Sequence, residues 1–469
     1  MADVLIIGGG MCGLGMALLL ARDGHAVTVV ERDAEPPPGS PQEAWGRWER
    51  QGVAQFRQPH NFMPGLRLLL ESELPDVQDA LRHAGASRFD MLNPLPPFFT
   101  DQSPRPIDGM LWTYTARRPV GEWAFANAAR DEPGVAIRRG VRVAGLLTGP
   151  APIGGVPHVV GVRTADGEVL KADIVIDAMG RRSKSPEWLT ALGARPVYEE
   201  QADCGFSYYT RYFSGSEPQR IGPVFMVLGT IAILTLPGDN GTWSVTIMTS
   251  AGDQPLKALR HVEHWTKVVG ACPLQAHWLD GEPITDILAM SGIVDRYRRF
   301  VVDGTPVVTG FVPVADAWAC TNPSAGRGLT VGFLHAVKLR DALRHDDPRA
   351  VVAEFDALTE ADVTPWYHAQ IAADRVRFAE IEALREGREP PPPSDELGRQ
   401  LLSLFATMVA DPDLFRAAIE YVGTITPIQQ IVRRPDVAER IRVATEAMQD
   451  SPPIVMPGPD RRELLQLVA

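Results

Sequence analysis

Cysteine is scarce in this sequence. The four cysteines are Cys12, Cys204, Cys272 and Cys320. They lie far apart and form no CxxC pair, so neither a disulfide framework nor a zinc knuckle is indicated. A reducing, cytoplasmic setting is therefore expected. No metal site is expected, because His261 and His264 have no third ligand at a recognisable spacing.

A long hydrophobic run is also missing. The most apolar stretch, residues 224–236, holds 13 residues, whereas a membrane-spanning helix needs about 20. Residues 1–3 lead directly into an apolar run without a basic segment, so no signal sequence is expected. We interpret 224–236 as a buried strand, with a hydrophobic substrate wall as a second role.

Positive charge is in deficit. Lys and Arg number 46 against 58 Asp and Glu, which gives a net charge of −12. This balance disfavours nucleic acid or an anionic membrane as the main partner, because both require clustered positive charge. Hydrophobic residues make up 45%, a share typical of a globular core.

A glycine-rich turn stands at the start of the chain. Gly8, Gly10 and Gly13 fit the pattern GxGxxG between an apolar strand and a helix with apolar spacing. Glu31 ends the next strand 18 residues after Gly13. The three glycines allow a tight turn, a close approach to a diphosphate, and close packing of helix and strand. The helix N-terminus offers free N–H groups to phosphates, and Glu31 can accept hydrogen bonds from a ribose. An acid at this position fits FAD and NAD equally.

Strand and helix patterns alternate over much of the chain. We expect helices over 66–81, 121–129 and 328–344, and strands that include 174–176 and 307–309. Residues 205–248 are rich in strand-type runs, and the chain after residue 345 is mostly helical. The predicted fold is α/β, with a Rossmann-type FAD-binding domain (glutathione-reductase-like), an inserted β-sheet-rich substrate domain and a helical C-terminal region. The predicted FAD-binding segments are 1–75, 110–185 and 300–345; the substrate domain is 76–109 and 186–299, and the helical region is 346–469.

Two later segments resemble a known family. Residues 171–180 read KADIVIDAMG, and residues 315–329 read ADAWACTNPSAGRGL. With the GxGxxG turn they resemble the three FAD signatures of the para-hydroxybenzoate-hydroxylase-like FAD-dependent monooxygenases. The sequence DAMGRRS at 177–183 is closest to the squalene-epoxidase-like and bacterial polyether epoxidase branch. Residues 204–213 likewise look like the strand that enters the substrate domain of those members.

The resemblance implies a set of FAD contacts. Asp316 would bind the ribityl and diphosphate part, and the turn 323–328 would pass close to the flavin ring. Arg118 matches an FAD-contacting arginine, and Val143 lies on the strand that meets the adenine. The predicted cofactor-binding residues are Gly8, Gly10, Met11, Cys12, Gly13, Glu31, Arg32, Arg118, Val143, Gly180, Asp316, Pro323, Gly326, Gly328 and Leu329.

One position departs from the family pattern. The third signature usually has Gly-Asp, and this chain has Ala315-Asp316. Alanine resists positive φ more strongly than glycine does. If the position requires positive φ, the local loop is expected to differ.

The resemblance implies an FAD-dependent monooxygenase acting through a flavin C4a-hydroperoxide. The substrate would be a bulky apolar molecule, such as a polyketide or terpenoid alkene, that is epoxidised or hydroxylated. Two alternatives stay open: an FAD-dependent reductase or dehydrogenase of an apolar substrate, and a flavoprotein with a binding role or a non-redox role such as cyclisation. No second GxGxxG is present, so electrons would come from NAD(P)H that docks transiently or from a separate reductase.

Few side chains stand out as catalytic. His60 lies in RQPH, a segment that is near the flavin in epoxidase-like members, and is a candidate proton donor or hydrogen-bonding group; a structural histidine is the alternative. Arg211 is a candidate contact for substrate or flavin, or a strand-surface residue stacked on aromatic rings. Candidate apolar lining residues are Phe62, Met63, Trp112, Phe206, Phe225, Met226 and Ile233.

Overall fold

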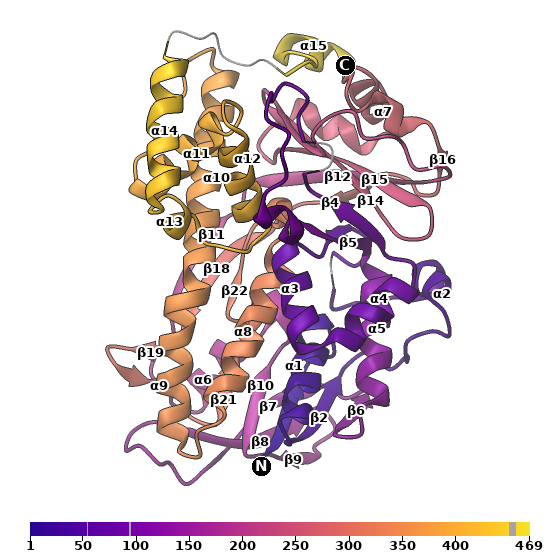
Figure 1. Ribbon diagram of the computed structural model, residues 1–469. Coiled ribbons are helices and arrows are strands. Elements are labelled where there is room, and N and C mark those ends of the chain that lie inside the picture. Colours follow the sequence, from indigo (N-terminus) through magenta and orange to yellow (C-terminus); the bar gives the residue numbers. More distant parts are fainter. Residues whose placement is uncertain (54, 93–94, 450–455) are drawn as a thin grey trace.

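The computed structural model describes residues 1–53, 55–92, 95–449 and 456–469. A parallel sheet organises the lower half of the molecule in Figure 1, in the strand order β21-β10-β1-β2-β6. These strands are β1 (Asp3–Ile7), β2 (Ala26–Glu31), β6 (Val135–Arg139), β10 (Ile174–Asp177) and β21 (Phe311–Pro313). The apolar strand next to the N-terminus therefore lies at the centre of the sheet, as its composition predicts.

Both faces of this sheet are covered. Val4 and Ile6 face a helical layer of α1 (Met11–Arg22), α5 (Arg118–Asp131) and α8 (Gly328–Ala342). Leu5 and Ile7 face the antiparallel sheet of β7 (Val143–Gly149), β8 (His158–Thr164) and β9 (Val169–Lys171). The period-2 alternation of a strand sends successive side chains to these two cores. The predicted α/β fold is confirmed.

Two predicted elements are wrong in detail. The single helix expected over 66–81 is two helices, α3 (Pro64–Glu73) and α4 (Pro75–His83). Leu74 leaves the helical conformation before Pro75 (φ −139°, ψ 58°), because a proline disfavours helical backbone in the residue before it. Residues 307–309, which were expected to form a strand, do not form one. The strand that pairs with β10 at this edge of the sheet is β21 at 311–313.

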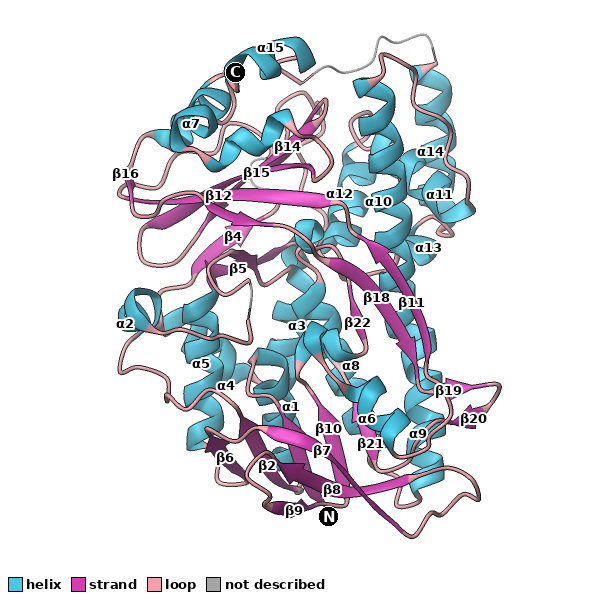
Figure 2. Cartoon of the chain, turned by 180° about the vertical axis from the view of Figure 1, so that it is seen from behind, coloured by secondary structure: helices cyan, strands magenta, loops and turns pink. Residues whose placement is uncertain are grey.

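A second, antiparallel sheet lies above the first, as Figure 2 shows. Its strand order is β13-β14-β15-β12-β16, and β17 also pairs with β12. The strands are β12 (Phe206–Ser214), β13 (Phe225–Leu228), β14 (Ile231–Pro237), β15 (Thr242–Ser250), β16 (Glu282–Pro283) and β17 (Leu288–Met290). One face packs on α7 (Val262–Gly270) and α15 (Arg461–Leu467). The other face is directed at the cavity described below.

Smaller sheets link the two large ones. One pairs β3 (Pro59–Asn61), β5 (Trp112–Arg117) and β4 (Ser87–Asp90). Another pairs β11 (Tyr198–Asp203), β18 (Val294–Arg299) and β22 (Ala319–Cys320). The hairpin of β19 (Val301–Val302) and β20 (Thr305–Pro306) projects beside α9 (Pro348–Leu358). The short helices α2 (Pro41–Arg47) and α6 (Ser185–Ala191) complete this part.

The C-terminal region is helical, as predicted. It contains α9 (Pro348–Leu358), α10 (Thr364–Arg385), α11 (Glu396–Thr407), α12 (Pro412–Val422), α13 (Ile428–Ile431) and α14 (Pro435–Met448). Helices α10 to α14 share a core that includes Trp366, Leu404 and Tyr421, whereas Val351 of α9 is buried in the core around α1.

Two segments pack across the predicted domain limits. Val77 and Leu81 of α4 are buried in the core around α1 rather than against the second sheet. Leu464 and Val468, near the C-terminus, are buried in the core of the second sheet. The division into three regions stays a prediction. In the structure, α4 packs with the predicted FAD-binding domain and α15 packs with the predicted substrate domain.

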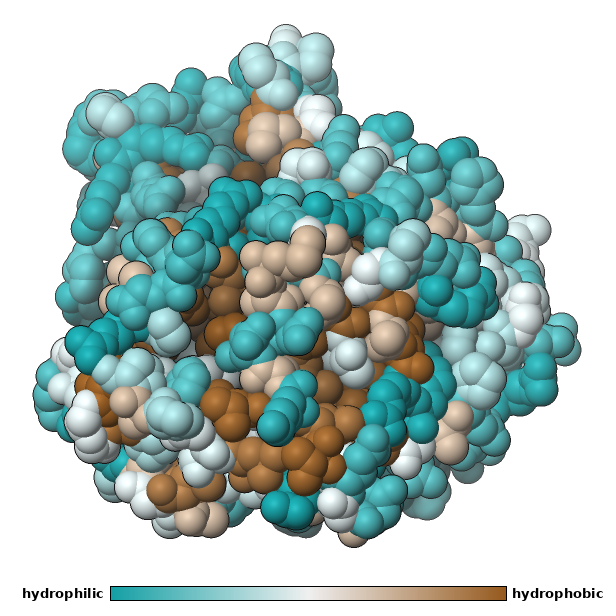
Figure 3. All heavy atoms as spheres, turned by 90° about the horizontal axis from the view of Figure 1, so that it is seen from below, coloured by the Kyte–Doolittle hydropathy of each residue, from teal (hydrophilic) through white to brown (hydrophobic). Residues whose placement is uncertain are grey.

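The face opposite the second sheet carries exposed apolar surface. Figure 3 shows apolar side chains gathered in the middle of this face and ringed by polar ones. A shallow hollow at the amino-terminal edge of the parallel sheet is lined by Val4, Val27, Val135 and Leu170, among others. Among the described residues, no helix has the length and apolarity that crossing a membrane requires.

Candidate functional site

The GxGxxG turn folds as its glycines require. Gly8 has φ +110°, and a Cβ there would lie 2.6 Å from the carbonyl oxygen of Ala178. A Cβ at Gly13 would lie 2.1 Å from the carbonyl oxygen of Gly8. Gly10 instead faces open space, and α1 begins there with no side-chain cap and no acidic residue in its first turn. The amide groups of this helix start are therefore free to bind an anion.

The second signature forms the turn beside it. Asp177 is fully buried at the end of β10, and its carboxylate accepts hydrogen bonds from the backbone N of Met179 (2.9 Å) and the hydroxyl of Ser183. Burial raises the pKa of Asp177. Asp177 thus holds residues 178–183 against the Gly8 turn, and Gly180 reverses the chain with φ +74°.

The third signature keeps its turn despite the alanine. Ala315 adopts φ +51°, the left-handed conformation that normally selects glycine. The position therefore takes positive φ with an alanine in place, and a difference from the family's loop stays a prediction. The backbone N of Ala315 donates to Nδ1 of His335 (3.3 Å), and a Cβ at Gly332 would lie 2.9 Å from the methyl group of Ala315. Glycine at 332 makes room for the methyl group, and His335 holds the strained backbone.

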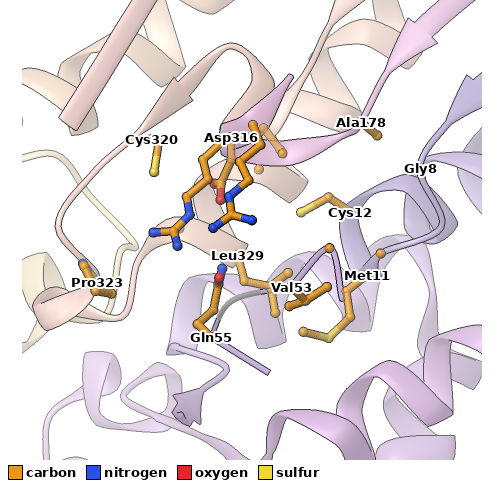
Figure 4. Close-up of a pocket in the computed structure, with 18 of the residues that line it drawn as sticks. Gly8, Met11, Cys12, Val53, Gln55, Ala178, Asp316, Cys320, Pro323 and Leu329 are labelled. Atoms are coloured by element: carbon orange, nitrogen blue, oxygen red, sulfur yellow. The ribbon is translucent and has the colours of Figure 1, made fainter. Parts of the chain in front are cut away.

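Asp316 follows this turn and points into the cavity. Figure 4 shows its side chain between Cys12 and Pro323. Within the described ranges no group donates a hydrogen bond to its carboxylate, and burial raises its pKa against the effect of Arg118 and Arg181. Acceptor oxygens held in this way suit hydroxyl donors of a ligand.

A buried charge cluster supports the end of β2. Glu31 accepts hydrogen bonds from the backbone N of Gly9 (2.8 Å) and from Nη2 of Arg50 (2.7 Å). Arg50 also binds Asp33 (2.9 Å) and Glu122 (3.1 Å), and its side chain is only 2% exposed. Arg50 fixes Glu31 beside the glycine turn. No sequence pattern indicated Arg50, because its role depends on contacts 19 and 72 residues away.

His60 and Arg118 form a pair at the cavity wall. Nη1 of Arg118 lies 2.7 Å from Nε2 of His60, and Nδ1 of His60 lies 3.0 Å from the carbonyl oxygen of Gln58. Arg118 also binds Glu122 (3.0 Å). Burial, reinforced by Arg118, lowers the pKa of His60 to about 3. The neutral ring donates its one N–H to Gln58 and accepts from Arg118, so His60 positions Arg118 and does not act as an acid near neutral pH.

All fifteen predicted cofactor-binding residues line one cavity of about 550 Å³. His60 lines it as well, and Arg211 does not: its Nε donates to the carbonyl oxygen of Thr285 (3.0 Å). Among the residues that the structure describes, eight basic side chains but only two acidic ones, Glu31 and Asp316, line the cavity. The basic residues are Arg32, Arg50, Arg118, Arg142, Arg181, Arg182, Lys184 and Arg327. In a chain of net charge −12, this concentration of positive charge favours an anionic ligand.

The second sheet forms an apolar wall of the same cavity. Leu234, Met248 and Met290 of its strands line the cavity, and so does Ile293, which follows β17. None of the seven apolar residues proposed from the sequence does so. Ile233, for example, is buried with α7 on the opposite face, because neighbouring residues of a strand face opposite sides.

The C-terminal helices contribute lining that the sequence did not indicate. Trp366, Tyr367 and Gln370 of α10 face the cavity. Arg327, at the start of α8, donates to the hydroxyl of Tyr421 (2.8 Å) and stacks 4.0 Å above the Tyr421 ring. This contact joins the helical region to the turn of the third signature.

The comparisons with known proteins match this geometry. Residues 3–79 match the family model for FAD-dependent oxidoreductases. These residues form the first part of an FAD-dependent oxidoreductase domain, whose parallel sheet is completed by β6, β10 and β21. The predictions of FAD as cofactor and of an oxidoreductase are confirmed at this level. The chain carrying this domain is 27% identical over 365 residues to Protein Rv3254 of Mycobacterium tuberculosis, across 72% of both chains.

Solved structures share the fold around the oxidoreductase domain. The Diels–Alderase PyrE3 of pyrroindomycin biosynthesis superposes with a TM-score of 0.56 at 18% identity, over 90% of this chain and 80% of that one. 2-Methyl-3-hydroxypyridine-5-carboxylic acid oxygenase gives 0.55 at 18% identity, over 85% and 96%. The resemblance to the para-hydroxybenzoate-hydroxylase-like flavoproteins is confirmed for the fold.

Proposed function

We propose that the protein is an FAD-dependent monooxygenase that oxygenates a bulky apolar small molecule. The observation that carries the proposal is a single cavity with two different ends. One end has free helix amides and basic side chains suited to a diphosphate, and the other has an apolar sheet wall. When bound and reduced, FAD supplies the electrons and the chemistry that activates oxygen.

The residues present fit FAD. Gly10 leaves open space where a Cβ would stand, and the uncapped start of α1 can bind the diphosphate. Asp316 has a carboxylate without an internal donor among the described residues, which suits the hydroxyl groups of the ribityl chain. The start of α8 also lacks a side-chain cap and an acidic first turn. Its positive end and Arg327 would stabilise negative charge on a reduced flavin.

The side chains near the apolar wall would orient the substrate and exclude water rather than transfer protons. Burial raises the pKa of Cys12 to about 12, so this thiol is not a nucleophile near neutral pH. His60 is neutral and fully hydrogen-bonded. Leu234, Met248, Met290 and Ile293 provide the apolar surface that a polyketide or terpenoid skeleton would contact.

A non-redox role is the second candidate. The similar fold of PyrE3, a Diels–Alderase, supports a hypothesis in which bound FAD is structural and the apolar wall shapes a cyclisation. A reductase of an apolar substrate would use the same two ends of the cavity. Under either redox hypothesis, NAD(P)H or a separate reductase would supply the electrons.

Cofactor binding is tested by Gly10→Val. A side chain at position 10 occupies the open space without backbone strain, since Gly10 has φ −83°. We expect the variant to fold and to lose FAD affinity at least 100-fold, measured by quenching of flavin fluorescence. Gly145→Val is the matched control, because Gly145 also faces open space and lies outside the cavity lining. Equal FAD affinity in both variants would contradict the assigned diphosphate site.

The reaction is tested with ¹⁸O₂. The FAD-loaded protein, with chemical or enzymatic reduction, is incubated with alkene and arene candidates of polyketide and terpenoid type. One ¹⁸O atom in the product supports monooxygenation. A cyclised product without label, formed equally with oxidised FAD, would support the non-redox candidate, and a saturated product would support the reductase.

A further inference from the structure

Two hydroxyl groups stand on the otherwise apolar sheet wall of the cavity. Tyr208 of β12 and Thr246 of β15 both line the cavity. Tyr208 pairs with Met248 and Thr210 pairs with Thr246 across the two strands. Tyr208 and Thr246 are therefore diagonal neighbours on one face, roughly 7–8 Å apart at the backbone. What these hydroxyls can offer a ligand depends on where their protons point.

The proton of Tyr208 is committed to Asn322. The backbone N of Ser324 donates to Oδ1 of Asn322 (2.9 Å), and a backbone N–H can only donate. This contact fixes the orientation of the Asn322 amide. Because the hydroxyl of Tyr208 bonds the same Oδ1 atom, it must be the donor. Nδ2 of Asn322 donates to Oδ1 of Asp374 (2.9 Å), in agreement with this orientation.

The proton of Thr246 is committed by the same logic. Nε2 of Gln58 donates to the carbonyl oxygen of Leu288 (3.3 Å), which fixes the Gln58 amide. Oε1 of Gln58 then accepts from the hydroxyl of Thr210 (2.8 Å). Thr210 has no second proton, so Thr246 must donate in the 2.8 Å contact between the two threonines.

We infer that the sheet wall recognises a ligand through an O–H or N–H donor. Both wall hydroxyls donate their protons within the protein, so toward the cavity they present acceptor lone pairs only. Within the proposed function, on which this inference rests, the substrate has an apolar skeleton that carries a hydroxyl or N–H group facing β12 and β15. An ether or ketone at the same place would leave these acceptors without a donor.

The network behind the wall is rigid enough to hold this polarity. Tyr208 and Thr246 are 3% and 2% exposed, and Thr210 is fully buried. Gln370 also donates to Oδ1 of Asp374 (2.9 Å) and so anchors the far end of the chain that begins at Tyr208. Reversing either chain of hydrogen bonds would leave at least one buried polar group without its partner, which is unfavourable.

The test compares two probes on the FAD-loaded protein that share one apolar skeleton and differ by a methyl group on the oxygen. 4-tert-Butylphenol carries a donor, and 4-tert-butylanisole carries only an acceptor. We expect calorimetry to give at least tenfold tighter binding of the phenol, the size of one hydrogen bond. Thr246→Val should reduce this preference several-fold. Thr235→Val, on the opposite face of β14 from Leu234, should leave it unchanged.

The most specific test is a variant in which Thr246 can donate a hydrogen bond to the ligand, because its affinity for the acceptor-only probe should rise. Thr210→Val removes the acceptor that Thr246 uses, and Thr210 does not line the cavity. Thr246 is then free to donate to a ligand, so the variant should gain affinity for the anisole relative to the parent protein. A purely structural role of Thr210 would weaken both probes equally, and that result would overturn the inference.

Tyr208→Phe distinguishes two sources of the donor. If the donor belongs to the substrate, FAD affinity stays unchanged and the phenol preference falls. If the donor is an N–H group of the flavin, FAD affinity falls several-fold and the preference for the phenol is unchanged. In that case Thr246 is the hydroxyl that contacts the substrate. Equal binding of phenol and anisole to parent protein that holds FAD would overturn the inference, whereas failure to hold FAD at all would overturn the proposed function.

Discussion

The guanidinium group of Arg117 binds both carboxylate oxygens of Asp239. Nε lies 3.0 Å from Oδ1, Nη2 lies 2.6 Å from Oδ2, and the backbone N of Arg117 donates to Oδ1 at 2.8 Å. Asp239 is fully buried, and Arg117 stacks 4.6 Å from the ring of Trp45. Asp239 lies in the turn between β14 and β15, and Arg117 immediately precedes α5. The pair therefore joins the second sheet to the nucleotide-binding half of the chain.

We predict that Asp239→Ala lowers the free energy of unfolding by about 3–5 kcal/mol, because it leaves a buried guanidinium without its counter-ion. Chemical denaturation at pH 7 measures the change. Glu168→Gln is the control, since the Arg138–Glu168 pair is 40% and 43% exposed and should contribute less than about 1 kcal/mol. Similar losses in the two variants would show that burial of the Arg117–Asp239 pair adds nothing to stability.

Two substitutions of Ala315 should have different effects on stability. Ala315→Gly relieves about 1–2 kcal/mol of left-handed backbone strain. It also loses a buried methyl group and gains freedom in the unfolded chain, which together cost a similar amount. We expect a net change within about 1 kcal/mol. Ala315→Val should lose about 3 kcal/mol or more, because the added methyl groups meet Gly332 of α8. Thermal unfolding of both variants checks this, and a valine that is tolerated as well as glycine would contradict it.

His335 should make the protein sensitive to acid. Burial lowers the pKa of His335 from 6.5 to about 3. The unfolded chain takes up this proton below pH 6.5 while the folded chain does not, so stability is complete above pH 6.5 and falls as the pH drops toward 3. Each pKa unit is worth about 1.4 kcal/mol. The loss from this one group between pH 6.5 and 4 is therefore about 3 kcal/mol.

His335→Phe tests this dependence. The variant is less stable at pH 8, because the backbone N of Ala315 loses its acceptor. Its unfolding free energy should nevertheless fall less steeply than that of the parent protein between pH 6.5 and 4. Parallel curves in urea titrations over this range would rule out His335 as the source of the acid sensitivity.

Asp374 should act in the opposite direction. Burial, with the charge of Asp295, raises the pKa of Asp374 from 3.8 to about 7. The folded state holds a proton that the unfolded state releases, so stability falls as the pH rises from 3.8 through 7. Asp374→Asn keeps the acceptor for Asn322 and Gln370 but carries no charge. We expect the variant to be more stable than the parent by up to about 4 kcal/mol at pH 8 and to match it near pH 4. An unchanged difference across this range would contradict the prediction.

The nucleotide end of the cavity could be predicted closely from the sequence. Gly8, Gly10 and Gly13 are recognisable because a local turn needs each of them, and their spacing is visible within six residues. The segment around Asp316 is recognisable for the same reason. A backbone turn that requires glycine leaves a short, recognisable pattern in the sequence. Residues from distant parts of the chain could therefore be assigned to one site, and all fifteen predicted cofactor-binding residues line the same cavity.

The substrate end could not be predicted in the same way. Ile233 and Leu234 are both apolar, and only the register of β14 with β15 decides which one faces the cavity. Arg50 and Gln370 act through partners that are distant in sequence. Ala315 could be singled out from the sequence, but its accommodation could not be predicted, because it depends on Gly332 and His335 on another element.

The basic lining of the cavity has a consequence for how quickly the cofactor enters. At 0.01 M salt the Debye length is about 30 Å. The charges of the whole chain then act on approaching FAD, a dianion, and the net charge of −12 repels it. At physiological ionic strength this length shrinks to about 8 Å, and the dianion is influenced mainly by the cavity lining, where eight basic side chains outnumber two acidic ones. Raising the salt concentration from 0.01 M to physiological ionic strength should therefore increase the association rate of FAD, and only higher salt should decrease it.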